Sequence, residues 1–257
     1  MVLSVESIKP DRLKKIASPT NIIFGNSKGG VGKSTLALMA GLGLATRHQN
    51  ADIEIIDLDP QATSSDSLQR FTNERFSVVR DEDFFLASGS PNNGNIVNHI
   101  GHDRARPQRQ KFIIFDSPAG SDPIRSSFLL HCDIIFVPTS VADADVFATH
   151  KFLAGLQELI DKRSTADERL PAVVILPNMV DCRDDFNNVR HAFGAEPFLL
   201  GHPLYYAPIY RRAFRADEGD VSVKLLLKQA KPYLKWLVDV ISNHDSLPRM
   251  PAKLYQL

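Results

Sequence analysis

The sequence predicts an α/β fold with a doubly wound, mostly parallel sheet that is flanked by helices. Short apolar runs recur along the 257 residues and alternate with helical or polar stretches, which is typical of βαβ units. The runs are nearly continuous in Ile, Val and Phe, as expected for strands that helices cover on both faces. A glycine-rich turn follows the first run and leads into an Ala- and Leu-rich segment with helical spacing. We therefore expect one doubly wound domain.

The expected elements follow one another in a simple order along the chain. Residues 1–20 are expected to form an N-terminal extension with a short helix after Pro10, and residues 21–257 a single domain. Within that domain, residues 203–257 are expected to be helical and basic. The polar, turn-rich segment between Leu86 and Gln110 is expected to be a surface excursion. The six expected strands are 22–24, 53–56, 112–115, 134–137, 173–176 and 198–200.

The segment NSKGGVGKST joins the first expected strand to the first expected helix. Gly29, Gly30 and Gly32 lack Cβ atoms, so the backbone can curl with its N–H groups inward and approach an anion closely. Lys33 then supplies a charge for the outer phosphates and Ser34 a hydroxyl for Mg²⁺, while the helix start adds its positive dipole end. This pattern predicts a P-loop NTPase. Nucleotide contacts are expected from Lys28, Gly29, Gly30, Val31, Gly32, Lys33, Ser34 and Thr35.

Acidic residues stand at the ends of two expected strands, where a parallel sheet binds its ligands. Asp116 ends KFIIFD and has the position of a Walker B acid, which holds Mg²⁺ directly or through water. Asp57 and Asp59 end IEIIDLD, and Asp59 is the better candidate to position the attacking water because a mobile switch would begin there. The sequence leaves the division of roles between these two open. The expected metal ligands are Ser34, Asp57 and Asp116.

Asn178 follows another buried run, in VVILPNMVD. Its amide can both donate to and accept from the edge of a nucleotide base. The alternative is an ordinary turn asparagine, since Asn is common in turns. Asn178 is therefore a candidate for the base contact.

Composition and cysteine usage limit the classes of protein to consider. Lys and Arg number 30, as do Asp and Glu, so net charge gives no argument for a nucleic-acid or membrane partner. Cys132 and Cys182 are the only cysteines and lack metal-ligand spacing, which indicates reduced thiols. The first 20 residues carry charges throughout, and nowhere do 18 consecutive apolar residues occur. We expect a cytoplasmic protein that is neither exported nor membrane-spanning.

Four segments, SKGGVGKST, IIDLDPQATSS, FIIFDSPAG and ILPNMVD, match the ParA/MinD family of deviant Walker A ATPases in order and spacing. The chain resembles that family from about Asn21 to Asp181. In the family, the lysine at the Lys28 position reaches across a nucleotide-sandwich homodimer to the partner's phosphates. The resemblance implies ATP and Mg²⁺ as cofactors, dimerisation on ATP binding, and catalysis by Lys28, Lys33 and Asp59. Ser27 departs from the family pattern, which has Gly at this position.

Within the family, DLDPQ and PLYYAPIYRRAFRADEGD are similar to DNA-partitioning ParA proteins. This similarity implies a nucleoid-associated protein that binds non-specific DNA and segregates a plasmid or chromosome, with a centromere-binding adaptor that stimulates slow hydrolysis. One rival is a ParA/MinD-like ATPase that positions a protein assembly. Another is a P-loop small-molecule ligase, which Lys28 and the absence of a recognisable extra substrate pocket disfavour. A non-hydrolysing homologue is a third.

Basic residues gather near the C-terminus. From His202 to Leu257 there are nine Lys or Arg against five Asp or Glu, and the lysines recur at helical spacing on one face. Pro232 is expected to kink or divide this helix. The residues are candidates for DNA phosphate contacts, although a solvated helix face explains the stripe equally well. A membrane-targeting tail is disfavoured because the last 13 residues show no amphipathic period. The candidate DNA contacts are Arg211, Arg212, Arg215, Lys224, Lys228, Lys231 and Lys235.

Overall fold

The computed structural model describes residues 18–59, 68–105, 109–163, 169–212 and 219–249. Their strands form one eight-stranded sheet in the order β3-β2-β4-β1-β5-β6-β7, and β8 also pairs with β6. Every one of these strand pairs is parallel. The strands are β1 (Thr20–Phe24), β2 (Asp52–Asp57), β3 (Phe76–Val79), β4 (Lys111–Asp116), β5 (Ile134–Thr139), β6 (Ala172–Val180), β7 (Leu199–Leu200) and β8 (Leu204–Tyr205).

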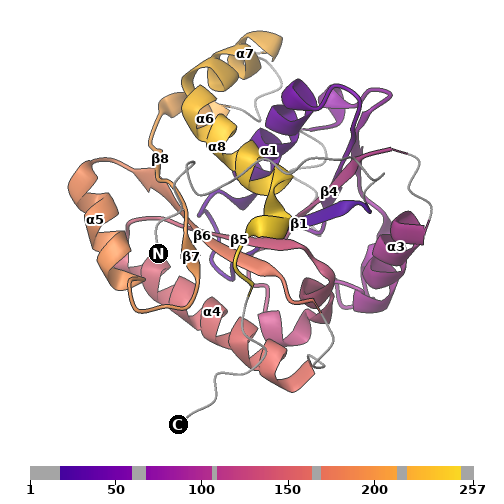
Figure 1. Cartoon of the computed structure of the whole chain (residues 1–257), viewed down its shortest axis with the longest axis horizontal. Coiled ribbons are helices and arrows are strands. Elements are labelled where there is room, and N and C mark those ends of the chain that lie inside the picture. The colour runs from indigo at the N-terminus through magenta and orange to yellow at the C-terminus, as the bar shows by residue number, and fades with distance from the viewer. Residues whose placement is uncertain (1–17, 60–67, 106–108, 164–168, 213–218, 250–257) are drawn as a thin grey trace.

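Helices cover both faces of this sheet, so the predicted doubly wound architecture is confirmed (Figure 1). Helices α1, α7 and α8 pack on one face, and α3, α4 and α5 pack on the other. The helices are α1 (Lys33–Arg47), α3 (Asn93–Ala105), α4 (Asp143–Arg163), α5 (Arg183–Ala192), α6 (Pro208–Arg212), α7 (Gly219–Gln229) and α8 (Lys231–Ser242).

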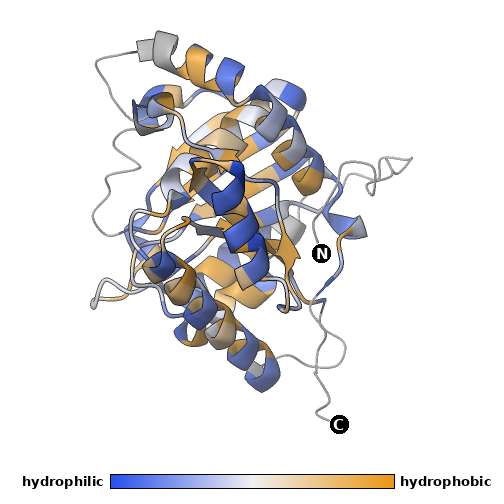
Figure 2. Cartoon of the chain, turned by 90° about the vertical axis from the view of Figure 1, so that its left-hand side faces the viewer, coloured by the Kyte–Doolittle hydropathy of each residue, from blue (hydrophilic) through white to orange (hydrophobic). Residues whose placement is uncertain are grey.

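The alternation of side chains along each strand divides the core into two layers. In β1, Ile22 and Phe24 pack toward α1 and α8, whereas Ile23 packs toward α3 and α4. Both layers need apolar residues at every strand position, which explains the continuous apolar runs. Figure 2 shows the apolar colour gathered on the strands and inner helix faces, and the polar colour on the outer faces. No helix in the described part of the chain combines the length and apolar character that a membrane crossing needs.

The segment between Leu86 and Gln110 corrects one sequence expectation. It was expected to be a surface excursion, but it contains α3, whose Ile96 and Ile100 are buried in the core. These two isoleucines anchor the helix in the core. The many Asn, Gly and His residues around them leave too few apolar positions for the helical periodicity to be recognised in the sequence. The sequence also missed β3 and β8, which are short and lie at the sheet margins.

The C-terminal lysine-rich segment forms two helices. Pro232 was expected to kink or divide a single helix here, and the segment is divided. Helix α7 ends at Gln229, and α8 begins at Lys231 with Pro232 in its first turn. Proline is tolerated there because first-turn N–H groups have no partner within the helix. The apolar side of both helices is buried, including Val223, Leu226 and Leu234.

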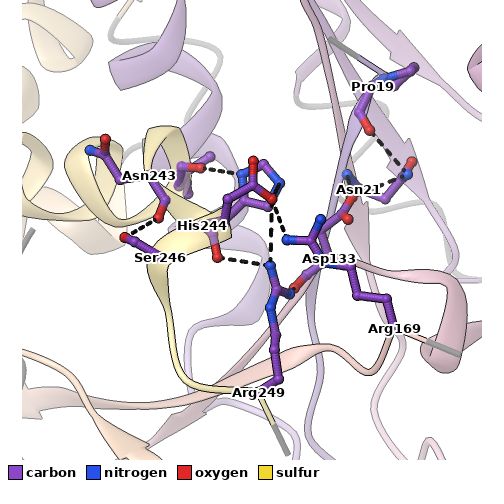
Figure 3. Close-up of polar contacts among 10 residues, drawn as sticks. Pro19, Asn21, Asp133, Arg169, Asn243, His244, Ser246 and Arg249 are labelled. Carbon is purple, nitrogen blue, oxygen red and sulfur yellow. Dashed lines mark hydrogen bonds and ion pairs between the residues drawn. The ribbon is translucent and has the colours of Figure 1, made fainter. Parts of the chain in front are cut away.

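Beyond α8 the chain crosses the edge of the sheet where the strands begin. Arg249 donates from Nη1 to the carbonyl of Asp133 at 2.5 Å and from Nη2 to the carbonyl of His244 at 2.8 Å (Figure 3). Asp133 in turn accepts from the backbone N–H of Asn21 at 2.8 Å. Burial acts to raise the pKa of the Asp245 carboxyl, but its contacts with Arg169 and His244 outweigh this effect and lower the pKa. This cluster fastens the C-terminal segment to β1 and β5.

His244 makes this cluster sensitive to acid. Burial lowers the pKa of its imidazole, although Asp133 and Asp245 partly oppose the effect. Between this lowered pKa and the ordinary value near 6.5, the unfolded chain binds a proton that the folded chain excludes, so stability falls as pH falls.

We expect the free energy of unfolding to decrease below about pH 6.5, by at most about 1.4 kcal/mol per pH unit from this residue. His244→Asn should reduce that slope, since an amide can still donate to the Ile241 carbonyl but cannot titrate. Urea titrations between pH 5 and 8 measure the slope. The exposed His191→Asn is the matched control, and equal slopes in the two variants would contradict the assignment.

Candidate functional site

The glycine loop lies at the edge of the sheet where the strands end, between β1 and α1. Gly30 and Gly32 have φ angles of 79° and 94°, in the left-handed region that favours glycine. Gly32 is the N-cap of α1 and has no side chain to cap the helix. A Cβ at Gly30 would meet nothing within 4 Å, so this side of the loop is open. The loop therefore has the curl and the exposed helix start that a bound phosphate requires.

Lys33 turns back into this loop. Its side chain is largely buried, and Nζ donates to the carbonyl of Lys28 at 2.9 Å. Burial lowers the pKa of the amine, while the carboxylates of Asp116 and Asp59 partly offset the effect. The cation thus lies between the loop and the acidic strand ends. The predicted contact of Lys33 with phosphate stays a prediction.

Two of the predicted carboxylates are neighbours in the sheet. Asp57 ends β2 and Asp116 ends β4, the two residues are in register, and each is 1% exposed. Asp59 lies two residues beyond Asp57, and its backbone N–H donates to Asp57 Oδ1 at 2.9 Å. The predicted switch segment, residues 60–67, lies outside the described residues.

This arrangement suits Mg²⁺ bound together with phosphate. Among the described residues no three His, Cys, Asp or Glu side chains converge as a complete metal site. Mg²⁺ commonly takes only one or two protein carboxylates and completes its shell with phosphate oxygens and water. Asp57, Asp116 and the Ser34 hydroxyl at the start of α1 fit that incomplete set.

Asn178 lies within β6 rather than just beyond it, and it fastens the loop. Its Nδ2 donates to the carbonyl of Val31 at 2.8 Å, and its Oδ1 accepts from the N–H of Met179 at 2.9 Å. Met179 has a φ of 55°, which is uncommon for a residue with a side chain, and the pairing of β6 with β8 shifts register here. The expected base contact of Asn178 remains a prediction.

Two further polar residues belong to the site and were missed by the sequence reasoning. Asn26 is fully buried, and its Nδ2 donates to the Pro138 carbonyl and to Thr149 Oγ1, both at 2.8 Å. Its Oδ1 accepts from the N–H of Lys28 at 3.1 Å. Asp145, in the first turn of α4, lies 3.6 Å from Lys28 Nζ. Pro138 and Thr149 are more than 100 residues from Asn26 in sequence, and Asp145 is more than 100 residues from Lys28. A polar residue shortly after a buried strand was nevertheless a usable signal for Asn26.

Ser27 stands where the family pattern has Gly, and the backbone explains why serine fits. Its φ is not positive, in contrast to those of Gly30 and Gly32. Its carbonyl accepts from the N–H of Gly120 at 2.7 Å, which ties the loop to the segment that follows β4. The substitution leaves the curl of the loop intact.

A hollow of about 460 Å³ adjoins the loop on the side of Asp59. The segment after β4 forms one wall, and residues 89–93 form another. Arg125 and Asp122 supply further charges to its lining. The sequence did not indicate this hollow, and the expected absence of an extra substrate pocket stays a prediction.

The four predicted lysines of the basic region are all exposed. Lys224 and Lys228 share a face of α7, and Lys231 and Lys235 share a face of α8. Lys231 and Lys235 also line a hollow of about 270 Å³ together with Arg47 of α1, which the sequence did not single out. Arg212 is exposed, whereas the side chain of Arg211 and all of Arg215 lie outside the described part.

Comparisons with known proteins agree with this geometry. Residues 22–218 match the model of the CobQ/CobB/MinD/ParA nucleotide binding domain. A search of curated proteins returned no match. Similar solved structures include the ATP complex of a Cyanothece McdA variant, with 14% identity, a TM-score of 0.63, and coverage of 91% of this chain and 99% of that one.

Two other similar structures come from related systems. MinD of Aquifex aeolicus is 16% identical, with a TM-score of 0.58, and the match covers 91% of this chain and 100% of that one. The pNOB8 ParA bound to nonspecific DNA is 13% identical, with a TM-score of 0.57, and the match covers 88% of this chain and 97% of that one. At these identities the likeness establishes the fold.

Gly32 offers a direct test of the loop geometry. A Cβ at this position would lie 2.2 Å from Asn178 Nδ2, and its φ of 94° disfavours any side chain. Gly32→Ala should lower the free energy of unfolding by about 2–3 kcal/mol, through backbone strain and loss of the bond to Val31. It should also weaken binding of a fluorescent ATP analogue.

Gly101→Ala is the matched control, because Gly101 is an exposed helical residue with nothing within 4 Å of its Cβ direction. This change should raise stability by up to about 1 kcal/mol. Urea titration of both variants gives the comparison. Equal stability of the two would show that the loop adopts another conformation.

Proposed function

This chain belongs to the CobQ/CobB/MinD/ParA family of nucleotide-binding domains, and from that premise we propose that it is an ATP-dependent dimerisation switch. Residues 21–257 act as one ATPase domain that binds non-specific DNA and segregates a plasmid or chromosome. The observation that carries the proposal is the different placement of two lysines five residues apart. Lys33 is buried between the loop and the carboxylates, while the side chain of Lys28 is 45% exposed.

The proposed ATP site uses the loop and the strand ends together. Backbone N–H groups of residues 29–35 bind the phosphates, and Lys33 neutralises their outer charge. Ser34, Asp57 and Asp116 would hold Mg²⁺, which draws charge from the transferring phosphoryl group when bound. Asp59 positions the attacking water, because it extends beyond the buried Asp57. Asn178 contacts the base edge with its second amide N–H and the second lone pair of Oδ1, because Val31 takes only one N–H and Met179 only one lone pair.

Lys28 provides the link between hydrolysis and dimerisation. Phosphoryl transfer is accelerated mainly by positioning and by neutralising charge on the transferring group. If Lys28 completes the active site of the partner subunit, hydrolysis requires the dimer. Because hydrolysis then removes the ATP that holds the dimer together, the dimer is transient. A centromere-binding adaptor would stimulate this slow step.

The exposed lysines of α7 and α8 support a role in binding non-specific DNA, since lysines bind phosphates without recognising the base sequence. The similar pNOB8 ParA was solved bound to nonspecific DNA. The similar McdA and MinD structures keep open a positioning ATPase for a protein assembly as the second candidate. DNA retention that depends on ATP separates the two.

The hollow beside Asp59 supports a third candidate, a small-molecule ligase. A substrate carboxylate bound there would lie next to the predicted phosphate site, with Arg125 as its counter-ion. The exposed Lys28 favours the switch instead. ATP turnover that needs DNA and a protein partner supports the switch, and turnover that needs only a small carboxylic acid supports the ligase.

Three variants test the mechanism. Lys33→Gln should bind ATP about 10- to 150-fold more weakly, because it removes a charge-assisted contact to phosphate. Lys28→Ala should bind ATP but stay monomeric, and Asp59→Ala should bind ATP and stay dimeric. Sedimentation with ADP and with a slowly hydrolysed ATP analogue measures the oligomeric state.

Lys162→Ala is the control for a lost positive charge, since Lys162 is exposed on α4 and pairs with Glu158. It should dimerise as the parent does. A monomeric, ATP-loaded Asp59→Ala protein, or a Lys28→Ala protein that dimerises normally, would refute the switch.

DNA binding by the lysines predicts a defined salt dependence. Four phosphate contacts give a plot of log K against log salt with a slope of roughly −3.6, and each of Lys224→Gln, Lys228→Gln, Lys231→Gln and Lys235→Gln should reduce its magnitude by about 0.9. Fluorescence anisotropy with a random duplex and the ATP-loaded protein gives the slope. Lys162→Gln should leave it unchanged, and a slope near zero for the parent would exclude the site.

A further inference from the structure

The side chain of Lys28 has a partner within its own subunit. Its Nζ lies 3.6 Å from Oδ1 of Asp145, which is on α4. The Asp145 side chain is 16% exposed, so the carboxylate is held mostly away from solvent. The lysine predicted to act in trans is thus engaged in cis before any second subunit arrives.

Asp145 is fixed in this position by its surroundings. Its Oδ2 accepts from the hydroxyl of Ser140 at 2.5 Å, which leaves Oδ1 toward Lys28. The Ser140 hydroxyl also accepts from the N–H of Ala142 at 3.2 Å, and the N–H of Asp145 donates to the Ala142 carbonyl at 2.9 Å. The carboxylate therefore presents one oxygen in a defined direction at little cost in side-chain entropy.

The backbone at Lys28 is tied to the same helix. Asn26 accepts from the Lys28 N–H and donates to Thr149 Oγ1, and that hydroxyl donates to the Asp145 carbonyl at 2.8 Å. Loop and helix are thus joined through buried and partly buried hydrogen bonds that do not involve the amine. The Lys28 amine can leave Asp145 by side-chain rotation alone, without moving the loop.

We propose that Asp145 is a positioning residue that holds Lys28 in its own subunit and competes with the partner's nucleotide for the amine. This inference rests on the proposed function, because it assumes that Lys28 acts in trans. A triphosphate carries more negative charge than one carboxylate, so a loaded partner outcompetes Asp145. An empty partner offers no such charge, and the lysine stays in cis. The ion pair thereby makes dimerisation more selective for the loaded state.

The strength of the pair sets the expected effect. A partly exposed ion pair shifts an equilibrium by up to about fivefold. Two such pairs are broken when a symmetric dimer forms. Removing them should therefore lower the dimer dissociation constant by about 2- to 25-fold.

Asp145→Asn tests this competition because an amide can still accept from Ser140 but carries no charge. Asp143→Asn is the matched control, since Asp143 is an exposed acid in the same first turn of α4. Sedimentation of the full chain with a slowly hydrolysed ATP analogue gives the dimer dissociation constant. We expect a decrease of more than about twofold, and up to about 25-fold, for Asp145→Asn, and a change within about twofold for Asp143→Asn. Equal effects of the two variants would overturn the proposal.

A second measurement keeps this test separate from the proposed function. In protein labelled with ¹⁵N-lysine and free of nucleotide, the Lys28 ammonium signal should exchange with water faster in Asp145→Asn, and Lys28→Ala identifies the signal. Unchanged exchange would overturn the cis pair even where dimers form. The parent protein could fail to dimerise while the Lys28 ammonium still exchanges faster in Asp145→Asn. That result would refute the proposed function and support the ion pair between Lys28 and Asp145.

Discussion

The buried amide of Asn26 is the contact on which the rest of the site depends. It joins the start of the glycine loop to β5 and α4 through Pro138 and Thr149. A loop rich in glycine loses much conformational entropy on ordering, so it needs fixed points at both ends. Asn178 supplies the second one through the Val31 carbonyl. Between these two amides the loop is held in a curl that its own residues would not maintain.

This anchoring determines the different environments of the two lysines. Lys33 is the first residue of α1, so its position follows from the helix, and its amine turns toward the loop and the acidic strand ends. Lys28 lies before the curl and next to the N-terminus of α4, where its amine reaches the surface. The two lysines cannot take each other's place, because Lys33 begins helix α1 and Lys28 does not. The contacts of Asn26 and Asn178 that fix the loop therefore also keep one lysine buried and the other exposed.

Much of this arrangement could be predicted from local sequence, and the rest depended on distant contacts. Continuous apolar runs identified six strands, and the glycine, lysine and acidic residues identified the edge at which they end. The position of Asn26 after a buried strand was a usable signal, but the partners of Asn26 and Asp145 could not be predicted, since the order of strands in the sheet brings them close. Helix α3 was missed because two buried isoleucines carry too little periodicity. The hollow beside Asp59 also arises from segments far apart in sequence.

The two edges of the sheet divide stability and function between them. At the edge where strands begin, Arg249, Asp133 and Asn21 form direct polar contacts that close the fold. At the opposite edge, Met179 adopts a positive φ, which costs free energy that surrounding contacts must offset, whereas Gly30 and Gly32 adopt theirs without steric strain. Such strain persists only where the neighbouring structure is over-determined, and the buried sheet between the two edges provides that support. The cluster around Arg249 thus contributes to the site indirectly, by stabilising strands β1 and β5 from which the loop and α4 emerge.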